Sequence, residues 1–169
     1  GVRNITLWCD NGGEDRAAQT LLEKKNMDVK FEFTAPNTPQ QNGKVERKFA
    51  TMYGKVRAML RSTNLSAETR HGLWAEAASL CSTIENVIIK PGEKKSPYQK
   101  FVGKVPRIYE DLHAFGEIAV VNYTGKKIKA KLDDRSRKCM FVGYGKDHGS
   151  KVYRLFDPTT NRVILSRDV

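Results

Sequence analysis

The stretch TAPNTPQQNGKVERK, residues 34–48, marks the point where a loop gives way to a long helix. Its two prolines disfavour regular structure, so residues 35–41 are expected to form a loop. Asn42 is a suitable N-cap residue, and apolar side chains recur at helical spacing after it. The pattern predicts a helix over residues 42–61. Its apolar positions are Val45, Phe49, Met52, Tyr53, Val56, Met59 and Leu60.

Upstream of this stretch, two short β-prone runs flank a helical pattern. Residues 5–9 are apolar and stop at Asp10, just before a Gly-rich turn, which predicts a buried strand. Residues 17–26 place leucines on one side and charged residues on the other, which predicts a short amphipathic helix. Residues 29–34 alternate between apolar and polar side chains, as in a half-buried strand. The order of these elements indicates an α/β unit.

Downstream, the pattern changes from helical to β-rich. Residues 67–89 predict a second long helix, and residues 98–102 a single helical turn. Several short strands at roughly even spacing then predict a small barrel or sandwich, so a domain boundary is expected between about residues 90 and 112. The expected strands are 114–123, 138–144, 151–156 and 163–169.

The charge of the chain is unevenly distributed. Its 169 residues suit one domain or two small ones, and 39% hydrophobic residues allow a packed core. The net charge is +11, and residues 90–138 supply +7 of it, with 13 basic and 6 acidic side chains. Clustered Lys and Arg are typical of proteins that bind polyanions. On charge alone, a solvated basic face kept for solubility explains the cluster equally well.

Several classes of protein are disfavoured by simple features. No stretch approaches the ~18 apolar residues of a membrane span, so an integral membrane protein is not expected. The first ten residues do not have the pattern of a signal peptide. The chain also lacks an initiator Met and opens within a strand-like run, which suggests a fragment of a longer protein.

The cysteines and histidines are too scattered to predict a zinc site or a disulfide framework. We therefore expect no zinc in this chain, and mostly buried, reduced thiols of an intracellular protein. These residues are Cys9, Cys81, Cys139, His71, His113 and His148.

Carboxylates are the remaining candidates for chemistry, because the chain has no GxSxG, GxxxxGK[ST] or GxGxxG motif. Asp10 lies where a strand ends, and Glu46 lies one turn into the predicted helix, close to the positive end of its dipole. Hard divalent cations prefer such oxygen ligands. With 19 acidic residues in the chain, spacing alone leaves an ordinary turn Asp and a solvated helical Glu as the simpler interpretation.

Two segments, CDNGGE at 9–14 and the block at 34–48, resemble the integrases of retroviruses and long-terminal-repeat retrotransposons, above all the copia (Pseudoviridae) type. That family carries two Asp and one Glu, with 35 residues between the second Asp and the Glu. Asp10 and Glu46 likewise enclose 35 residues. The resemblance continues in Leu73–Ala77, Ser96–Tyr98, His113–Gly116, Lys131–Asp133, Phe141–Tyr144, Tyr153–Pro158 and Ser166–Val169.

The resemblance implies a fold of two parts. An incomplete ribonuclease H-like α/β unit, the C-terminal part of the catalytic core, is expected over residues 1–90. A linker at 91–111 and a small SH3-like β-barrel at 112–169 follow. Because the rest of the core lies upstream in this family, residues 1–90 are expected to expose apolar surface, with the Asp10 and Glu46 carboxylates within ~10 Å of each other.

The resemblance also implies an activity. In such integrases the 3′-hydroxyl of element DNA attacks a target phosphodiester, with two Mg²⁺ or Mn²⁺ ions held by three carboxylates. Asp10 would be the second acid and Glu46 the third. The first Asp and the zinc-binding His-His-Cys-Cys module lie upstream in the family, so the chain alone is expected to show no strand transfer. Expected partners are element and target DNA and further copies of the enzyme, in the nucleus or a virus-like particle.

Contacts with DNA are expected at two places. The resemblance implies that Pro39, Gln40, Gln41 and Asn42 shape a DNA-positioning loop and that Lys44, Arg47 and Lys48 contact phosphates. The basic segment adds Lys126, Lys127, Lys129 and Lys131.

Some residues depart from the family pattern. Asn37 stands where Tyr is common, and Glu117 stands where Cys is typical. Glu85-Asn86-Val87 replaces the usual Asn-Arg pair. These departures suggest a decayed element copy, so a non-catalytic nucleic-acid-binding remnant or domesticated module remains an alternative to the enzyme. A ribonuclease H acting on hybrids shares the fold but does not account for the block at 34–48 or for the basic, β-rich C-terminal part.

Overall fold

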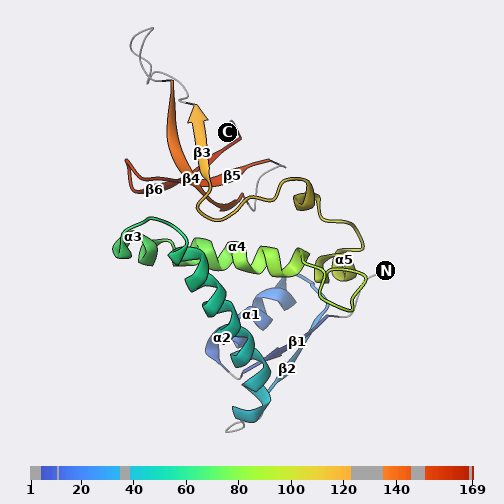
Figure 1. The fold of residues 1–169 in the computed structure, drawn as a ribbon. Helices are drawn as coiled ribbons and strands as arrows, with labels where there is room; N and C mark the ends of the chain where they lie inside the picture. The colour runs from blue at the N-terminus through green and yellow to red at the C-terminus, as the bar shows by residue number, and fades with distance from the viewer. Residues whose placement is uncertain (1–4, 11, 35–38, 123–134, 146–150, 168) are drawn as a thin grey trace. The chain divides into compact units, whose positions relative to one another are not determined.

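The fold is described from a computed structural model of the chain (Figure 1). Residues 5–169 are described with the exception of 11, 35–38, 123–134, 146–150 and 168, and the side chains of residues 39–42 and 44 are also outside the description. The chain divides into two compact units, Gly1–Thr51 and Met52–Val169. This division lies well before the predicted boundary near residue 90. The predicted limits of the domains therefore stay a prediction.

The first unit contains a parallel strand pair joined through a helix. Strand β1 (Ile5–Cys9) pairs with β2 (Val29–Phe33), from Ile5 opposite Val29 to Cys9 opposite Phe33. Helix α1 (Gly13–Lys24) lies between them in the chain, as a parallel pair requires a crossover connection. The unit is therefore mixed α/β, as predicted. Whether it is ribonuclease H-like stays a prediction.

Both helices that begin in the first unit start earlier than predicted. Helix α1 begins at Gly13 rather than Ala17, and its first turn carries Glu14 and Asp15, which favour a helix N-terminus. Helix α2 (Pro39–Arg61) begins at Pro39 rather than after Asn42. Proline is favoured at the first helical position because its missing N–H would be unpaired there anyway. The predicted loop is therefore wrong for residues 39–41.

The second unit begins with the end of α2 and continues through four short helical elements. These are α3 (Ala67–Gly72), α4 (Trp74–Val87), α5 (Pro97–Val102) and the 3₁₀ turn η1 (Arg107–Glu110). The single helix predicted over 67–89 is thus two helices, separated at the buried Leu73. Helix α5 is sharply bounded by a capping box between Ser96 and Gln99 and by Gly103, whose φ is 80°.

A four-stranded antiparallel sheet completes the second unit, in the order β3-β4-β5-β6 (Figure 1). Its strands are β3 (Ile118–Asn122), β4 (Ser136–Tyr144), β5 (Tyr153–Asp157) and β6 (Arg162–Ser166). All four predicted strands are confirmed, with shorter or shifted ends. The register shifts between Phe141 and Gly143, where a bulge bends β4. The sheet is consistent with an SH3-like domain, whereas its closure into a barrel stays a prediction.

Within the described residues, all of the buried hydrophobic side chains lie in the second unit. They come from the end of α2, from α4 and from the sheet, and Ala77, Val142 and Leu155 are fully buried. The first unit instead exposes Trp8 (69%) and Leu7 (39%), as predicted for residues 1–90. The other core residues are Val56, Leu60, Leu73, Leu80, Cys81, Val87, Phe115, Ala119, Val121, Cys139, Phe141, Val152 and Phe156.

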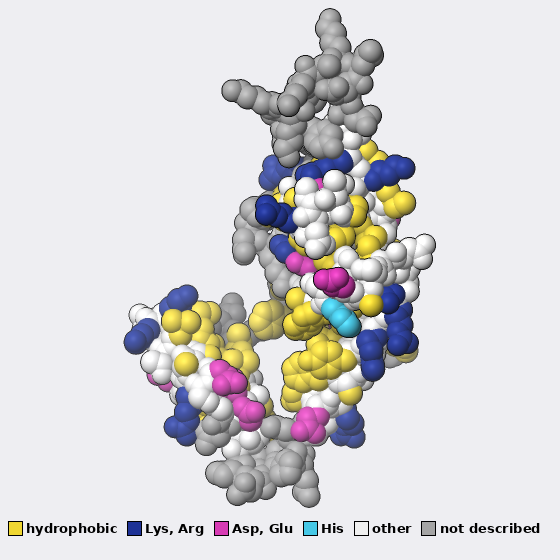
Figure 2. Space-filling view, turned by 90° about the vertical axis from the view of Figure 1, so that its left-hand side faces the viewer, with side chains coloured by type: hydrophobic (Ala, Val, Ile, Leu, Met, Phe, Trp, Pro, Cys, Tyr) yellow, Lys and Arg dark blue, Asp and Glu magenta, His cyan; other side chains and the backbone are white. Residues whose placement is uncertain are grey.

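The surface mixes charged and apolar side chains. Figure 2 shows Lys and Arg side chains beside patches of hydrophobic ones on the visible face. Cys81 and Cys139 are buried, as predicted, and Cys9 is half-buried. In the part of the chain that the structure describes, we find no helix both long and apolar enough to cross a membrane.

Candidate metal and nucleic-acid site

Asp10 lies directly after β1, at the carboxyl end of the strand, and is exposed. Its Oδ1 accepts the backbone N–H of Gly12 at 3.2 Å, which ties the carboxylate to the turn before α1. A Cβ atom at position 12 would lie 3.0 Å from that oxygen. Glycine at this position therefore lets the carboxylate lie close to the backbone.

Asp15 is a second carboxylate beside Asp10. Burial raises the pKa of Asp15, and a hydrogen bond with Asp10 and the negative charge of Asp10 raise it further. Two carboxylates in contact are stabilised by a shared proton or by a cation. Asp15 was not among the predicted site residues, because the predicted helix began only at Ala17. The acidic residues just before an amphipathic run were the signal that could have revealed it.

Glu46 lies on α2 with an exposed side chain, in the same compact unit as Asp10. Because α2 begins at Pro39, Glu46 is about two turns into the helix rather than one. The helix dipole acts mainly within the first turn, so the predicted effect of the dipole on Glu46 is weaker than expected. The predicted proximity of the Asp10 and Glu46 carboxylates stays a prediction.

Among the residues expected to contact DNA, the structure describes the side chains of Arg47 and Lys48. Both are exposed on α2, and the Nε of Arg47 donates to the carbonyl of Gly43 at 3.1 Å. The backbone of Pro39, Gln40, Gln41, Asn42 and Lys44 forms the start of α2, which corrects the predicted loop, but their side chains lie outside the description. Lys126, Lys127, Lys129 and Lys131 lie wholly outside the described residues.

No three His, Cys, Asp or Glu side chains converge as a set of metal ligands within the described ranges. The donors identified there for a cation are therefore Asp10 with its neighbour Asp15. A third ligand from Glu46 is the arrangement that the resemblance implies.

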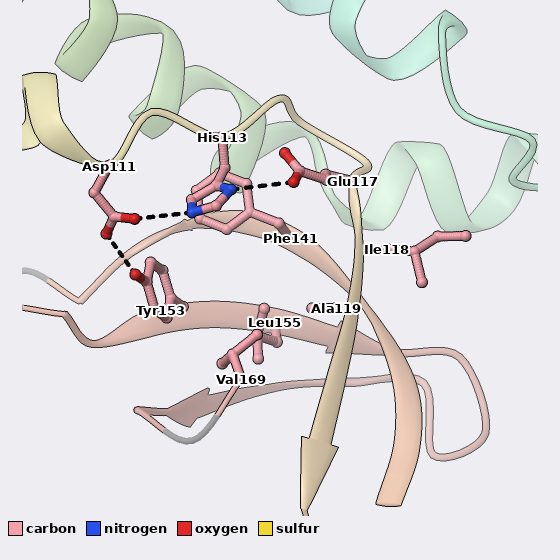
Figure 3. Close-up of a pocket in the computed structure, with 9 residues that line it drawn as sticks. All are labelled: Asp111, His113, Glu117, Ile118, Ala119, Phe141, Tyr153, Leu155 and Val169. Atoms are coloured by element: carbon pink, nitrogen blue, oxygen red, sulfur yellow. Dashed lines mark hydrogen bonds and ion pairs between the residues drawn. The ribbon is translucent and has the colours of Figure 1, made fainter.

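A pocket of about 260 Å³ in the second unit was not predicted (Figure 3). The imidazole of His113 lies at its rim between two carboxylates: its Nε2 is 3.0 Å from Oδ1 of Asp111 and its Nδ1 is 3.2 Å from Oε1 of Glu117. The hydroxyl of Tyr153 donates to the other oxygen of Asp111. The pocket is lined by Asp111, His113, Glu117, Ile118, Ala119, Phe141, Tyr153, Leu155 and Val169.

These groups shift one another's ionisation. Burial lowers the pKa of His113, but its hydrogen bonds to Glu117 and Asp111 outweigh burial and raise it. The Tyr153 hydroxyl lowers the pKa of Asp111, and the backbone N–H of Ala114 lowers that of Glu117. Burial and the bond to Asp111 raise the pKa of Tyr153 to about 12. Glu117, a departure from the family pattern in sequence, is thus a direct partner of His113.

Comparison with known proteins decides the relationship of the chain. Residues 118–169 match the family described as the retroviral polymerase SH3-like domain. The chain is 36% identical over 164 residues to the retrovirus-related Pol polyprotein from transposon TNT 1-94 of Nicotiana tabacum, a match that covers 96% of the chain. The predicted resemblance to a retrotransposon integrase region is thereby confirmed.

Two further transposon Pol polyproteins and one solved structure are similar to the chain. The Pol polyproteins from transposons RE1 and RE2 of Arabidopsis thaliana are 28% and 30% identical to the chain, each over 97% of it. The chain spans only 11–12% of the length of these three polyproteins. A structural match to the simian T-cell lymphotropic virus intasome, in complex with the PP2A regulatory subunit B56 gamma, has a TM-score of 0.40 at 15% identity. It covers 99% of the chain and 59% of the matched chain.

Proposed function

We propose that the chain is the part of a retrotransposon integrase that binds DNA and, within the complete enzyme, helps to join element 3′ ends to target DNA. The observation that carries the proposal is the match of 96% of the chain to a transposon Pol polyprotein. The compact units on either side of residues 51 and 52 supply different parts: acidic residues in the first, and the SH3-like sheet in the second. In this proposal the enzyme acts as a homo-oligomer in the nucleus or a virus-like particle.

Binding to DNA is expected to be electrostatic and independent of sequence. The net charge of +11 attracts phosphates, and residues 90–138 supply most of that excess. Each phosphate that a Lys or Arg neutralises releases condensed counterions, so affinity falls steeply as salt is added. We place the largest contribution on Lys126, Lys127, Lys129 and Lys131.

Fluorescence anisotropy on duplexes of unrelated sequence tests this proposal. Reversal of the four lysines to Glu should flatten the slope of log K against log salt by up to about four. A matched comparison uses two adjacent pairs, K126E/K127E and K24E/K25E, which change the net charge equally. If the two pairs weaken binding alike, only net charge matters and the basic segment is a solvated face.

The donor set around Asp10 fits a divalent cation. Asp10 and Asp15 offer hard oxygen ligands, and their mutual repulsion would be relieved by a positive ion. In the proposed enzyme Asp10 and Glu46 hold Mg²⁺ or Mn²⁺, which would activate the attacking hydroxyl and stabilise the leaving oxygen. With no further ligand from the protein, the carboxylates of Asp10 and Glu46 should bind such an ion only weakly, because Mg²⁺ gives up its bound water reluctantly.

Paramagnetic broadening by Mn²⁺ tests the cation site without any assay of activity. NMR signals of Asp10 and Gly12 should broaden in the wild type, and Asp10→Asn should abolish the effect. Glu23→Gln, on the exposed part of α1, is the matched control and should leave it unchanged. Uniform broadening of all exposed carboxylates would contradict a site at Asp10.

Strand joining separates the enzyme from the non-catalytic alternative. Within the complete polyprotein, Asp10→Asn and Glu46→Gln should each abolish joining while DNA binding persists. Residues 1–169 alone should join no strands, because the family's first Asp is not among them. Mg²⁺-dependent joining by the isolated chain would contradict the proposed ligand set. Full joining by both variants would favour a DNA-binding module.

A further inference from the structure

Both ring nitrogens of His113 face hydrogen-bond acceptors, so the side chain needs two N–H donors, one more than a neutral imidazole has. A neutral ring has one N–H donor and one lone pair, whereas an imidazolium donates from both nitrogens. Both ring nitrogens of His113 face a carboxylate oxygen, Asp111 at 3.0 Å and Glu117 at 3.2 Å (Figure 3). Ionised carboxylates only accept hydrogen bonds. Both contacts are therefore favourable only when His113 is protonated.

Neither carboxylate is free to turn away. The second oxygen of Asp111 accepts from the Tyr153 hydroxyl, and the second oxygen of Glu117 accepts from the backbone N–H of Ala114 at 3.0 Å. The imidazole itself packs against the Phe141 ring, with centroids 5.3 Å apart. When the ring is neutral, one nitrogen lone pair faces a carboxylate oxygen at hydrogen-bond distance, and that contact must open.

The remaining charged and titratable neighbours do not replace the missing proton. The Tyr144 hydroxyl donates to the carbonyl of Asp111 at 2.6 Å and accepts the backbone N–H of His113 at 3.1 Å. Lys151 acts on Asp111 only through its charge, and the Tyr153 proton is already donated. His113 is therefore the group whose proton decides whether both carboxylates are satisfied.

The segment from Asp111 to Glu117 has one end that depends on this proton and one that does not. Near Glu117, backbone bonds fix it to β4: Gly116 N–H to the carbonyl of Phe141, and Phe141 N–H to the carbonyl of Glu117, both at 2.8 Å. Near Asp111, the backbone N–H of Asp111 donates to the carbonyl of Ile108 at 3.1 Å, and the contacts with the sheet run through side chains around His113. Loss of the proton would therefore loosen residues 111–114 and leave residues 116–117 attached.

We propose that His113 is a proton-operated latch: its imidazolium fastens residues 111–114 at the rim of the 260 Å³ pocket, and loss of the proton releases them. The geometry sets the direction of the switch. The two carboxylates raise the pKa of His113, so the latch is closed at acidic pH and opens as pH rises through that raised value. Its contribution to stability is complete below the unfolded pKa, about 6.5, and is lost on the alkaline side.

Hydrogen exchange measured by NMR on the full chain, corrected for the intrinsic rate, tests the latch. The amides of His113 and Ala114 should lose protection by about tenfold or more as pH rises through the titration of His113, because local opening there is no longer opposed by the two ion pairs. The amides of Gly116 and Phe141 should keep theirs. Equal behaviour of all four amides, or a pKa of His113 at or below the ordinary value for histidine, would overturn the proposal.

Two variants and a control make the test independent of any single substitution. His113→Gln carries no positive charge to hold the two carboxylates, so the amides of residues 113 and 114 should lack the protection at every pH. His71→Gln, on the exposed α3, should behave as the wild type. Glu117→Gln is decisive even if His113→Gln does not fold. Its amide can donate to a neutral Nδ1 while its oxygen keeps the Ala114 N–H, so protection should persist at alkaline pH. A pH-dependent loss in Glu117→Gln would refute the latch.

Discussion

Among the described residues, residues 52–169 bury a core of apolar side chains, whereas residues 1–51 bury none completely. The second unit buries Leu155, Val142 and Ala77 completely between its helices and its sheet. In its described residues the first unit has two strands and one complete helix, and it exposes Trp8. A sheet of two strands buries too little surface to be stable by itself. The residues proposed for metal chemistry therefore lie in the unit with the weaker internal support, and the SH3-like sheet lies in the self-supporting one.

Matched leucines give the strongest test of this contrast. Leu155→Ala removes a fully buried side chain and should lower the free energy of unfolding by about 3–5 kcal/mol. Leu7→Ala, at a side chain that is 39% exposed, should cost less than about 1 kcal/mol. Urea denaturation followed by circular dichroism measures both. If both substitutions lowered the free energy of unfolding equally, the first unit would contain a stabilising core comparable to that of the second.

A buried carboxylate in the second unit gives the next largest effect. Asp157 is fully buried, pairs with Arg137, and accepts from the backbone N–H of Thr159 and the hydroxyl of Thr160, both at 2.9 Å. Asp157→Asn should cost about 3 kcal/mol, since it leaves the charge of Arg137 without its carboxylate partner. Asp28→Asn, in the first unit, is the exposed control and should change little.

The same carboxylate predicts acid sensitivity. Burial raises the pKa of Asp157, but bonds from Thr160 and Thr159 and the charge of Arg137 outweigh burial and lower it. Its contribution is therefore present above the unfolded value and is lost as pH falls through the lowered one. Thermal melts below about pH 4 should show a steeper decline for the wild type than for Asp157→Asn. Parallel declines would contradict this assignment.

Gly116 tests how tightly the sheet is joined to the preceding helices. Its φ is 90°, and a Cβ there would lie 2.7 Å from Cγ2 of Thr63. Gly116→Ala should cost about 2 kcal/mol from backbone strain and this clash. Adding Thr63→Ser removes the methyl group but keeps the hydroxyl bond to Leu60, so the double variant should recover part of the loss. If the effects of Gly116→Ala and Thr63→Ser on the free energy of unfolding were strictly additive, the structure would relieve the clash without removal of the Thr63 methyl group.

Two ion pairs, one in each unit, give the smallest expected difference in the free energy of unfolding. The guanidinium of Arg154 on β5 donates two bonds to Glu76 on α4, at 2.7 and 2.5 Å. Arg154→Lys loses the bidentate geometry and should cost about 1 kcal/mol. Lys30→Ala breaks the exposed pair with Glu32 in the first unit and should hardly change the free energy of unfolding, because water screens the pair. If urea denaturation showed a larger loss of unfolding free energy for Lys30→Ala than for Arg154→Lys, the proposed ranking of the two units by stability would be reversed.

The elements that sequence predicted well are those fixed by local patterns. The four strands of the second unit followed from short strand-like runs at roughly even spacing, separated by Gly and Asp/Pro turns. The early start of α2 was missed because a proline indicates a loop and a first helical residue equally well. The break at Leu73 was missed although Gly72, which disfavours a helix interior, directly precedes it.

The candidate site was predictable only in part. Asp10 and Glu46 were found by their spacing within a resemblance, whereas Asp15 depended on a helix boundary that sequence placed too late. The partners of His113 include Tyr153, 40 residues along the chain, and no periodic pattern indicates such a contact. The sequence showed that Glu117 departs from the Cys typical of the family, but only the three-dimensional structure showed its contact with His113.

The order in which the core residues are synthesised has a consequence for folding in the cell. Helix α4 contributes Ala77 and Leu80 to the core, and the same core includes Leu155 and Phe156 on β5, far along the chain. At ~5–20 residues per second, the ribosome needs about 4–16 s to add the intervening chain. During that interval the apolar face of α4 has no completed sheet to pack against. This nascent stage is where we expect chaperone contact and misfolding to be concentrated.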